Sequence, residues 1–262
     1  MTNMIRPTRR LIAGVSAAGL SIVLSGCGGV AAALNPRPTN FVLAFFDVSG
    51  TTKGVRNSYL RDANSTIGQL QAGDSLWADQ ITENTLATSR VPVQINLPTL
   101  NILSQNKDDY DAQLAAMKSQ ARTDVQALLN GNTSKTAILD SLLLAQKLFH
   151  GSCATAASRR VLVLFSDMLE DSNRYRFDRE TLTAVRIKQI IAREQADHRI
   201  ADLKGVEVYV AGATADPSGD PAQIGRIQAF WLAYFHAAGA ELADAHYSAS
   251  LLDFTLIGNY KK

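Results

Sequence analysis

The sequence of 262 residues is poor in the side chains that build disulfide frameworks and zinc sites. It has two cysteines, Cys27 and Cys153, and its four histidines are scattered, so no zinc-type Cys/His spacing occurs. A nucleophile elbow of the form Gly-x-Ser-x-Gly and a glycine-rich phosphate loop are also absent. The sequence therefore lacks the common motifs of serine hydrolases, nucleotide-binding proteins and zinc proteins.

The charges nearly cancel, with 26 basic and 24 acidic residues. Three of the basic residues, Arg6, Arg9 and Arg10, stand in the first ten residues, which hold no acid. Without these three, 23 basic residues face 24 acids, and the net charge is close to −1. No basic patch with interleaved aromatic residues is present, so we expect no nucleic-acid partner.

The N-terminus has the composition of a secretory signal. The three arginines precede residues 11–26, which are apolar and small and fewer than the roughly 20 residues that a membrane-spanning helix needs. The stretch Leu24-Ser25-Gly26-Cys27 resembles the lipobox of bacterial lipoproteins. This resemblance implies cleavage after residue 26, lipidation of Cys27 and a membrane anchor in the cell envelope. Gly28 is not the Asp that commonly retains such proteins at the inner membrane, which favours the outer membrane, facing the periplasm or the surface.

Other interpretations of this end stay open. They are an ordinary signal peptide with an incidental cysteine, or an uncleaved anchor. If Cys27 carries no lipid, a disulfide with Cys153 is the alternative, because an exported protein meets an oxidising compartment. Residues 27–39 have small residues and two prolines without periodicity, which is typical of a flexible tether. We expect one domain over residues 40–262.

Hydrophobic patterning predicts the fold class of that domain. Continuous apolar runs at 41–46, 161–165 and 206–211 indicate strands buried on both faces. Less continuous runs at 75–82, 91–97 and 246–256 predict further strands, and Pro92 and Pro98 mark 91–97 as an edge strand. Helical periodicity marks residues 57–71, 107–129, 135–149, 178–203 and 222–238. Alternating strands and helices predict a doubly wound α/β domain with a mostly parallel central sheet, helices on both faces and one antiparallel edge strand.

Oxygen-bearing side chains gather where the predicted strands end. Asp47, Ser49 and Thr51 follow the first buried strand at a spacing of two, which directs extended residues to one side. Asp167 follows a second buried strand, and Thr136 is expected in the first turn of a helix capped by Thr133 or Ser134. Carboxylates and hydroxyls at one edge of a sheet suit a hard cation, for which Mg²⁺ is the first expectation and Mn²⁺ or Ca²⁺ are alternatives.

The order Asp-x-Ser-x-Thr, then Thr136, then Asp167 resembles the metal-ion-dependent adhesion site of the von Willebrand factor type A family. Thr51 stands where the family more often has Ser, and Met168 stands where it usually has Gly. The resemblance implies a Rossmann-like domain that binds a protein partner, whose acidic side chain completes the metal shell. On position alone, Glu170, Asp171 and Arg174 are expected to line the rim that meets this partner.

Two other function classes remain open. The chain also resembles haloacid-dehalogenase phosphatases in its Asp47 after a buried strand, but their second acid two residues later is replaced by Ser49. A structural envelope lipoprotein without metal is the third possibility, because Asp, Ser and Thr are favoured in turns and helix caps anyway. We therefore expect a binding protein rather than an enzyme.

Overall fold

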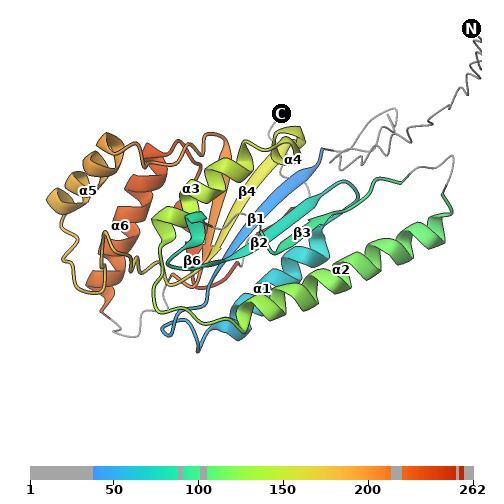
Figure 1. Ribbon diagram of the computed structural model, residues 1–262, viewed down its shortest axis with the longest axis horizontal. Helices are drawn as coiled ribbons and strands as arrows, with labels where there is room; N and C mark the ends of the chain where they lie inside the picture. The colour runs from blue at the N-terminus through green and yellow to red at the C-terminus, as the bar shows by residue number, and fades with distance from the viewer. Residues whose placement is uncertain (1–37, 88–90, 101–104, 214–219, 252–253, 257–262) are drawn as a thin grey trace, which may run out of the picture.

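A six-stranded sheet forms the centre of the part of the chain that the structure describes (Figure 1). The structure is a computed structural model, and it describes residues 38–87, 91–100, 105–213, 220–251 and 254–256. The strands lie in the order β3-β2-β1-β4-β5-β6, and β3 alone is antiparallel to its neighbour. Their bounds are β1 Asn40–Asp47, β2 Ser75–Ile81, β3 Val93–Asn96, β4 Arg159–Phe165, β5 Val206–Ala211 and β6 Tyr247–Ser248.

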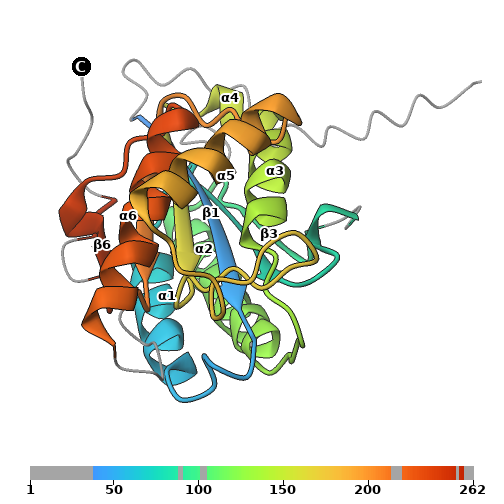
Figure 2. The ribbon, with the colours of Figure 1, turned by 90° about the vertical axis from the view of Figure 1, so that its left-hand side faces the viewer.

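Helices cover both faces of the sheet. Helices α1 (Arg56–Gln69) and α2 (Lys107–Leu129) pack on one face, below the sheet in Figure 1. Helices α3 (Ile138–Phe149), α4 (Ser152–Ala156), α5 (Ala184–Ala196) and α6 (Pro221–Ala237) pack on the other face. In Figure 1, α5 and α6 are at the left of the sheet, the side that faces the viewer in Figure 2. This arrangement and the strand order confirm the predicted doubly wound α/β fold with one antiparallel edge strand.

The central strand β1 explains why its sequence is apolar throughout. Phe41, Leu43 and Phe45 enter the core under α3, α5 and α6, while the residues between them enter the core over α1 and α2. Every residue of β1 is buried. A strand covered on both faces has no solvent-facing positions, so the alternation of polar and apolar residues disappears.

Three predicted elements have wrong boundaries. The helix expected at 178–203 is α5, which starts only after Thr183, whose hydroxyl accepts a hydrogen bond from Arg186 N (3.2 Å). It ends before His198, which has a positive φ of 54°. The helix expected from 135 begins at Ile138, so Thr136 lies before its first turn, and neither Thr133 nor Ser134 caps it. The last strand is two residues long rather than the predicted 246–256.

The predictions for the first 37 residues lie outside the described part of the chain. These are the signal, the lipidation of Cys27 and most of the tether. In the ranges that the structure does describe, no helix combines the length and the apolar character needed to cross a membrane. The lipid anchor on Cys27 and its alternative, a disulfide with Cys153, both stay predictions.

Candidate metal centre

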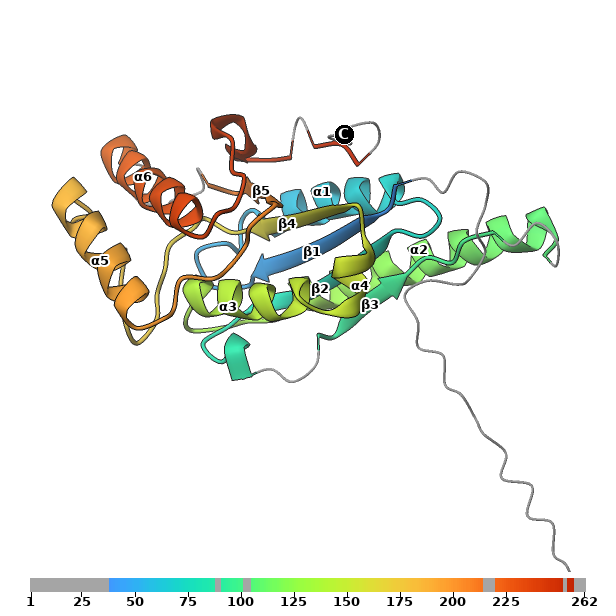
Figure 3. The same ribbon diagram turned by 90° about the horizontal axis from the view of Figure 1, so that it is seen from above.

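The predicted site lies at the switch point of the sheet. Strands β1 and β4 are parallel neighbours, and Figure 3 shows their arrowheads side by side. The chain leaves β1 toward α1 on one face and leaves β4 toward α5 on the other. In doubly wound sheets the divergence of two such connections leaves a crevice at the carboxyl ends of the strands, where ligands bind. Asp47 is the last residue of β1, and Asp167 follows β4 by two residues.

Asp47 is the centre of the contacts at this edge. Its carboxylate is fully buried and accepts hydrogen bonds from Ser49 N (2.8 Å) and from Ser166 Oγ (2.9 Å). Thr136 Oγ1 lies 3.5 Å from Asp47 Oδ1, at the long limit of a hydrogen bond. The contact with Ser166 joins the ends of β1 and β4, and the contact with Thr136 joins them to the segment before α3. Three segments far apart in the sequence therefore meet at one carboxylate.

The two hydroxyls after β1 lie together as their spacing predicts. Ser49 Oγ and Thr51 Oγ1 are 2.9 Å apart, and Thr51 is exposed while Ser49 is buried. The neighbouring Thr52 is fully buried and donates its hydroxyl to Asp47 O (2.8 Å) and Ser49 O (3.1 Å). The loop thus closes on itself, with Thr52 turned inward as a structural support and Thr51 turned toward solvent.

An arginine holds this loop against the next one. Arg56, at the start of α1, donates through Nη2 to the carbonyls of Val48 and Ser49, at 2.5 and 3.0 Å. Its Nη1 donates to the carbonyls of Leu129 and Gly131, at 3.0 and 2.8 Å. A planar guanidinium presents several donors in a fixed geometry, so one side chain can serve both loops. Arg56 therefore fixes the loop of Ser49 relative to the C-terminal end of α2.

Asp167 is held by its own turn. Its side chain is 2% exposed, and Leu169 N donates to its Oδ1 at 3.0 Å. The next residue, Met168, adopts a positive φ of 65°, a conformation that Gly adopts more readily than other residues. Met168 N donates to Ser166 Oγ (2.9 Å), the hydroxyl that donates to Asp47. The turn that presents Asp167 is thus joined to Asp47 through the Ser166 hydroxyl.

The segment after Asp167 is joined to the segment of Thr136. Thr136 and Asp171 exchange two backbone hydrogen bonds, of 2.9 and 3.0 Å. Glu170 is 1% exposed, and its carboxylate accepts from Leu139 N (3.1 Å) in the first turn of α3. Since Ala137 at the N-cap has no side-chain acceptor, Glu170 caps this helix from another part of the chain. The expectation that Glu170 lines an exposed rim is wrong, because its side chain is buried.

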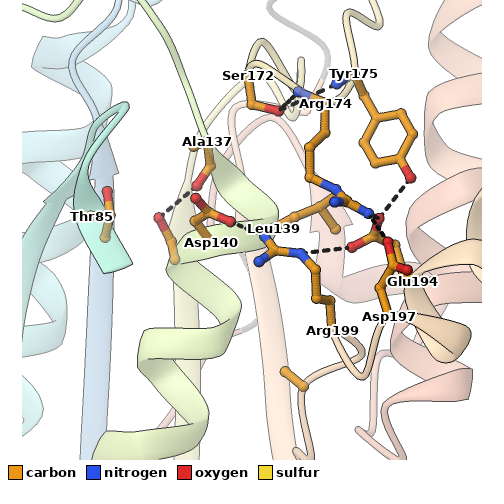
Figure 4. Close-up of polar contacts among 12 residues, drawn as sticks. Thr85, Ala137, Leu139, Asp140, Ser172, Arg174, Tyr175, Glu194, Asp197 and Arg199 are labelled. Atoms are coloured by element: carbon orange, nitrogen blue, oxygen red, sulfur yellow. Dashed lines mark hydrogen bonds and ion pairs between the residues drawn. The ribbon is translucent and has the colours of Figure 1, made fainter. Parts of the chain in front are cut away.

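An ion-pair network holds the rest of this segment (Figure 4). Glu194 of α5 is fully buried and accepts from Arg174 Nη2 (2.7 Å), Tyr175 Oη (2.6 Å) and Arg199 Nε (3.3 Å). Arg199, which follows α5, also pairs with Asp140 of α3, so the network joins α3, α5 and the segments before and after α5. Arg174 and Asp171 each take part in ion pairs, Asp171 with Arg176 at 3.3 Å. For these two residues, contact with a partner stays a prediction.

The carboxylate and hydroxyl oxygens at this edge of the sheet are of the kind that a hard divalent cation binds. Burial raises the pKa of Asp47 above its ordinary value, while hydrogen bonds from Ser49, Ser166 and Thr136 act in the opposite direction. Among the described residues, no lysine or arginine pairs with Asp47. A buried carboxylate without a basic partner requires a proton or a cation to offset its desolvation. No three His, Cys, Asp or Glu side chains of the described ranges form a metal group, so hydroxyls would have to supply ligands here.

The sequence alone missed several residues that build the site. Ser166 joins the two strand ends, Thr52 and Arg56 hold the loops, and Glu170 caps α3. Ser166 stands directly after a buried strand and was within reach of the same positional argument as Asp167. The other roles depend on which loops meet in space. Neither a scan against models of protein families nor a search of the curated proteins found a match to this chain.

Proposed function

We propose that this protein binds a divalent cation at the carboxyl edge of its sheet and, through the cation, an acidic side chain of a partner protein. Asp47, Ser49, Thr51, Thr136 and Asp167 would hold the cation. The observation that supports this proposal most is the meeting of Ser166 and Thr136 at the buried carboxylate of Asp47. It places hard oxygen atoms from three segments at the switch point of the sheet, independently of any family.

The cation would supply one piece of chemistry, the attraction of an anionic ligand. Two carboxylates carry just enough charge to balance a dication, and the hydroxyls are neutral. Mg²⁺ prefers about six oxygen ligands, and the proposed site offers five side chains. A carboxylate of a partner is such an oxygen ligand. Thr51 is exposed to solvent, while Asp47 and Asp167 are buried, so access to the site would be at Thr51. The protein's own residues would thus fix the position of the cation and leave one open direction.

The proposed location is the bacterial cell envelope, with a lipid on Cys27 in the outer membrane and the domain beyond residue 39 facing the periplasm or the cell surface. The N-terminal composition supports this proposal, and the mass of the mature N-terminal peptide tests it. A diacylglyceryl or triacyl addition on Cys27 would agree with it. An unmodified Cys27 bonded to Cys153 would contradict it.

Binding of Mg²⁺ to the folded state is the first test of the site. We would measure urea unfolding in chelator and in Mg²⁺, for the natural protein and for Asp47→Asn. A ligand at about 100 times its Kd raises the free energy of unfolding by about 2.7 kcal/mol. We expect this gain in the natural protein and its loss in Asp47→Asn, which keeps the size of the side chain but removes its charge.

The matched control is Asp111→Asn on the exposed part of α2. Asp111 lies 18 residues before the end of that helix, about 27 Å along its axis at 1.5 Å per residue. It should keep the full Mg²⁺ effect. Equal Mg²⁺ stabilisation in Asp47→Asn would contradict the proposed site. Absence of any effect in the natural protein would favour a metal-free structural lipoprotein, and turnover of a phosphate ester would favour the phosphohydrolase alternative.

A further inference from the structure

Two buried tyrosine hydroxyls lie near the proposed cation site. Tyr59 of α1 is 0% exposed and Tyr247 of β6 is 8% exposed. Within the described ranges, neither hydroxyl has a hydrogen-bond partner. Buried polar groups are nearly always paired, so these two hydroxyls need a partner such as a water molecule or a side chain that moves within reach.

The hydroxyl of Tyr59 lies at the carboxyl ends of β4 and β5. A Cβ atom placed on Gly212 would be 2.2 Å from Tyr59 Oη and 2.9 Å from Ser166 O. The ring of Tyr59 packs against Phe165, the last residue of β4, with 5.7 Å between the ring centroids. The phenol therefore extends along the end of β4 to the residue that precedes Asp167. Gly212 leaves the space that the hydroxyl occupies.

Tyr247 approaches the same edge from the other face of the sheet. It pairs in register with Val210 of β5 and belongs to the core under α3, α5 and α6, whereas Tyr59 belongs to the core over α1 and α2. Next to it, Gly212 N donates to Ser248 O at 3.0 Å. Gly212 thus lies beside the Tyr59 hydroxyl and is hydrogen-bonded to the residue that follows Tyr247.

The charge of Asp167 acts on both hydroxyls. Burial first, and then the charge of Asp167, raise the pKa of Tyr59 and of Tyr247 well above the ordinary value. For Tyr59 the charge of Asp47 acts in the same direction, and Arg56 opposes it. Both phenols therefore keep their protons at neutral pH and remain hydrogen-bond donors beside a carboxylate.

We propose that Tyr59 and Tyr247 are positioning residues for Asp167, to which their hydroxyls donate, directly or through one water molecule, when the site holds its cation. This inference rests on the proposed function. Neutral donors orient a carboxylate without competing with the cation, as charged side chains would. Residues that orient a metal ligand in this way typically change metal affinity 10–100-fold when they are replaced.

The test uses Tyr59→Phe, Tyr247→Phe and the double variant of the full chain, with calorimetric titration of Mg²⁺ and urea unfolding in chelator. We expect each single variant to bind Mg²⁺ about 10-fold more weakly or worse. Without metal, the same variants should unfold at an equal or higher urea concentration, because Phe removes a buried hydroxyl that lacks a partner. Opposite changes of affinity and stability distinguish positioning from packing, which would move both together or neither.

The matched control is Tyr110→Phe on α2. The Tyr110 hydroxyl donates to Pro98 O at 2.8 Å, so its loss should lower stability and leave the Mg²⁺ affinity unchanged. If the natural protein binds Mg²⁺ and Asp47→Asn does not, unchanged affinity in both tyrosine variants overturns this inference alone. If the natural protein itself binds no Mg²⁺, the proposed function fails and this inference with it.

Discussion

Glu170 offers the sharpest stability prediction, because one buried carboxyl group serves the helix that follows Thr136. Its oxygen accepts from Leu139 N at 3.1 Å, and Ser172 and the backbone of Ile138 also bond to it. Glu170→Ala removes the cap of α3 and so leaves a buried N–H without an acceptor, which costs about 1–3 kcal/mol. We therefore expect a loss of about 1–3 kcal/mol in the free energy of unfolding.

The charge of Glu170 predicts a pH dependence with a defined sign. Burial raises the pKa of Glu170 from 4.5 to about 8. Between these two values the folded protein binds more protons at this site than the unfolded chain does. The free energy of unfolding therefore falls as pH rises from about 4.5 to about 8, by at most about 1.4 kcal/mol per pH unit. Below about pH 4.5 Glu170 is protonated in both states and does not change the stability with pH. Above about pH 8 Glu170 is ionised in both states, and the full cost of its buried charge lowers the free energy of unfolding.

Glu170→Gln isolates this contribution, since Gln keeps an acceptor oxygen for Leu139 N and cannot ionise. The assay is urea unfolding of the natural protein and of Glu170→Gln at several pH values from 5 to 9, read by far-UV circular dichroism. We expect similar stabilities near pH 5 and an advantage of Glu170→Gln that grows toward pH 9. A stability difference that stays constant with pH, or that favours the natural protein at high pH, would refute the reasoning.

Two further predictions concern the supports of the site. Glu194→Gln replaces a fully buried carboxylate between Arg174 and Arg199 by a neutral amide, so we expect a loss of about 3–5 kcal/mol in the free energy of unfolding, measured in urea. Asp197→Asn at the exposed end of the network should have a much smaller effect, because solvent screens this ion pair. A small effect of Glu194→Gln would show that the network is dispensable. Gly212→Ala places a Cβ 2.2 Å from Tyr59 Oη at a φ of +104°, which should lower the melting temperature through a loss of at least about 2 kcal/mol. Its control, Gly225→Ala in α6, meets nothing within 4 Å and should stabilise by up to about 1 kcal/mol; equal effects at the two glycines would contradict the packing at Gly212.

The layers of the fold and its mostly parallel sheet could be predicted from the sequence, because strands buried on both faces leave a clear pattern. The run 41–46 predicted β1 to within two residues at its ends, and the prolines beside 91–97 marked the antiparallel edge strand. Boundaries that depend on single capping residues did not follow. Thr183 starts α5 six residues later than its apolar periodicity suggested, because a hydroxyl cap ended the preceding polar segment.

The candidate site also has a part that the sequence predicts and a part that it does not. Asp47, Ser49, Thr51 and Asp167 stand at the ends of recognisable strands, so their position at one edge was predictable. Thr136 was expected there too, but for a wrong local reason, since it precedes α3 instead of opening it. The pairing of Thr136 with Asp171, which places it, depends on contacts between loops that no periodicity records.

The role of Glu170 was also beyond the sequence. An acidic residue three positions after Asp167 is typical of a solvated loop, and charged residues are seldom fully buried. Only the position of α3, whose N-cap is an alanine, shows that a buried acceptor is needed there. Functions of this kind follow from the fold and not from the local sequence.

Direct binding of a paramagnetic cation tests the central claim most closely. Mn²⁺ would be titrated into chelator-treated protein and into Asp47→Ala, with free Mn²⁺ measured by electron paramagnetic resonance. The account predicts one saturable site per chain in the natural protein, displaced by Mg²⁺ and lost in Asp47→Ala. Equal binding by the two proteins, or no saturable binding by the natural protein, would contradict the assignment of a cation to Asp47 and its neighbours.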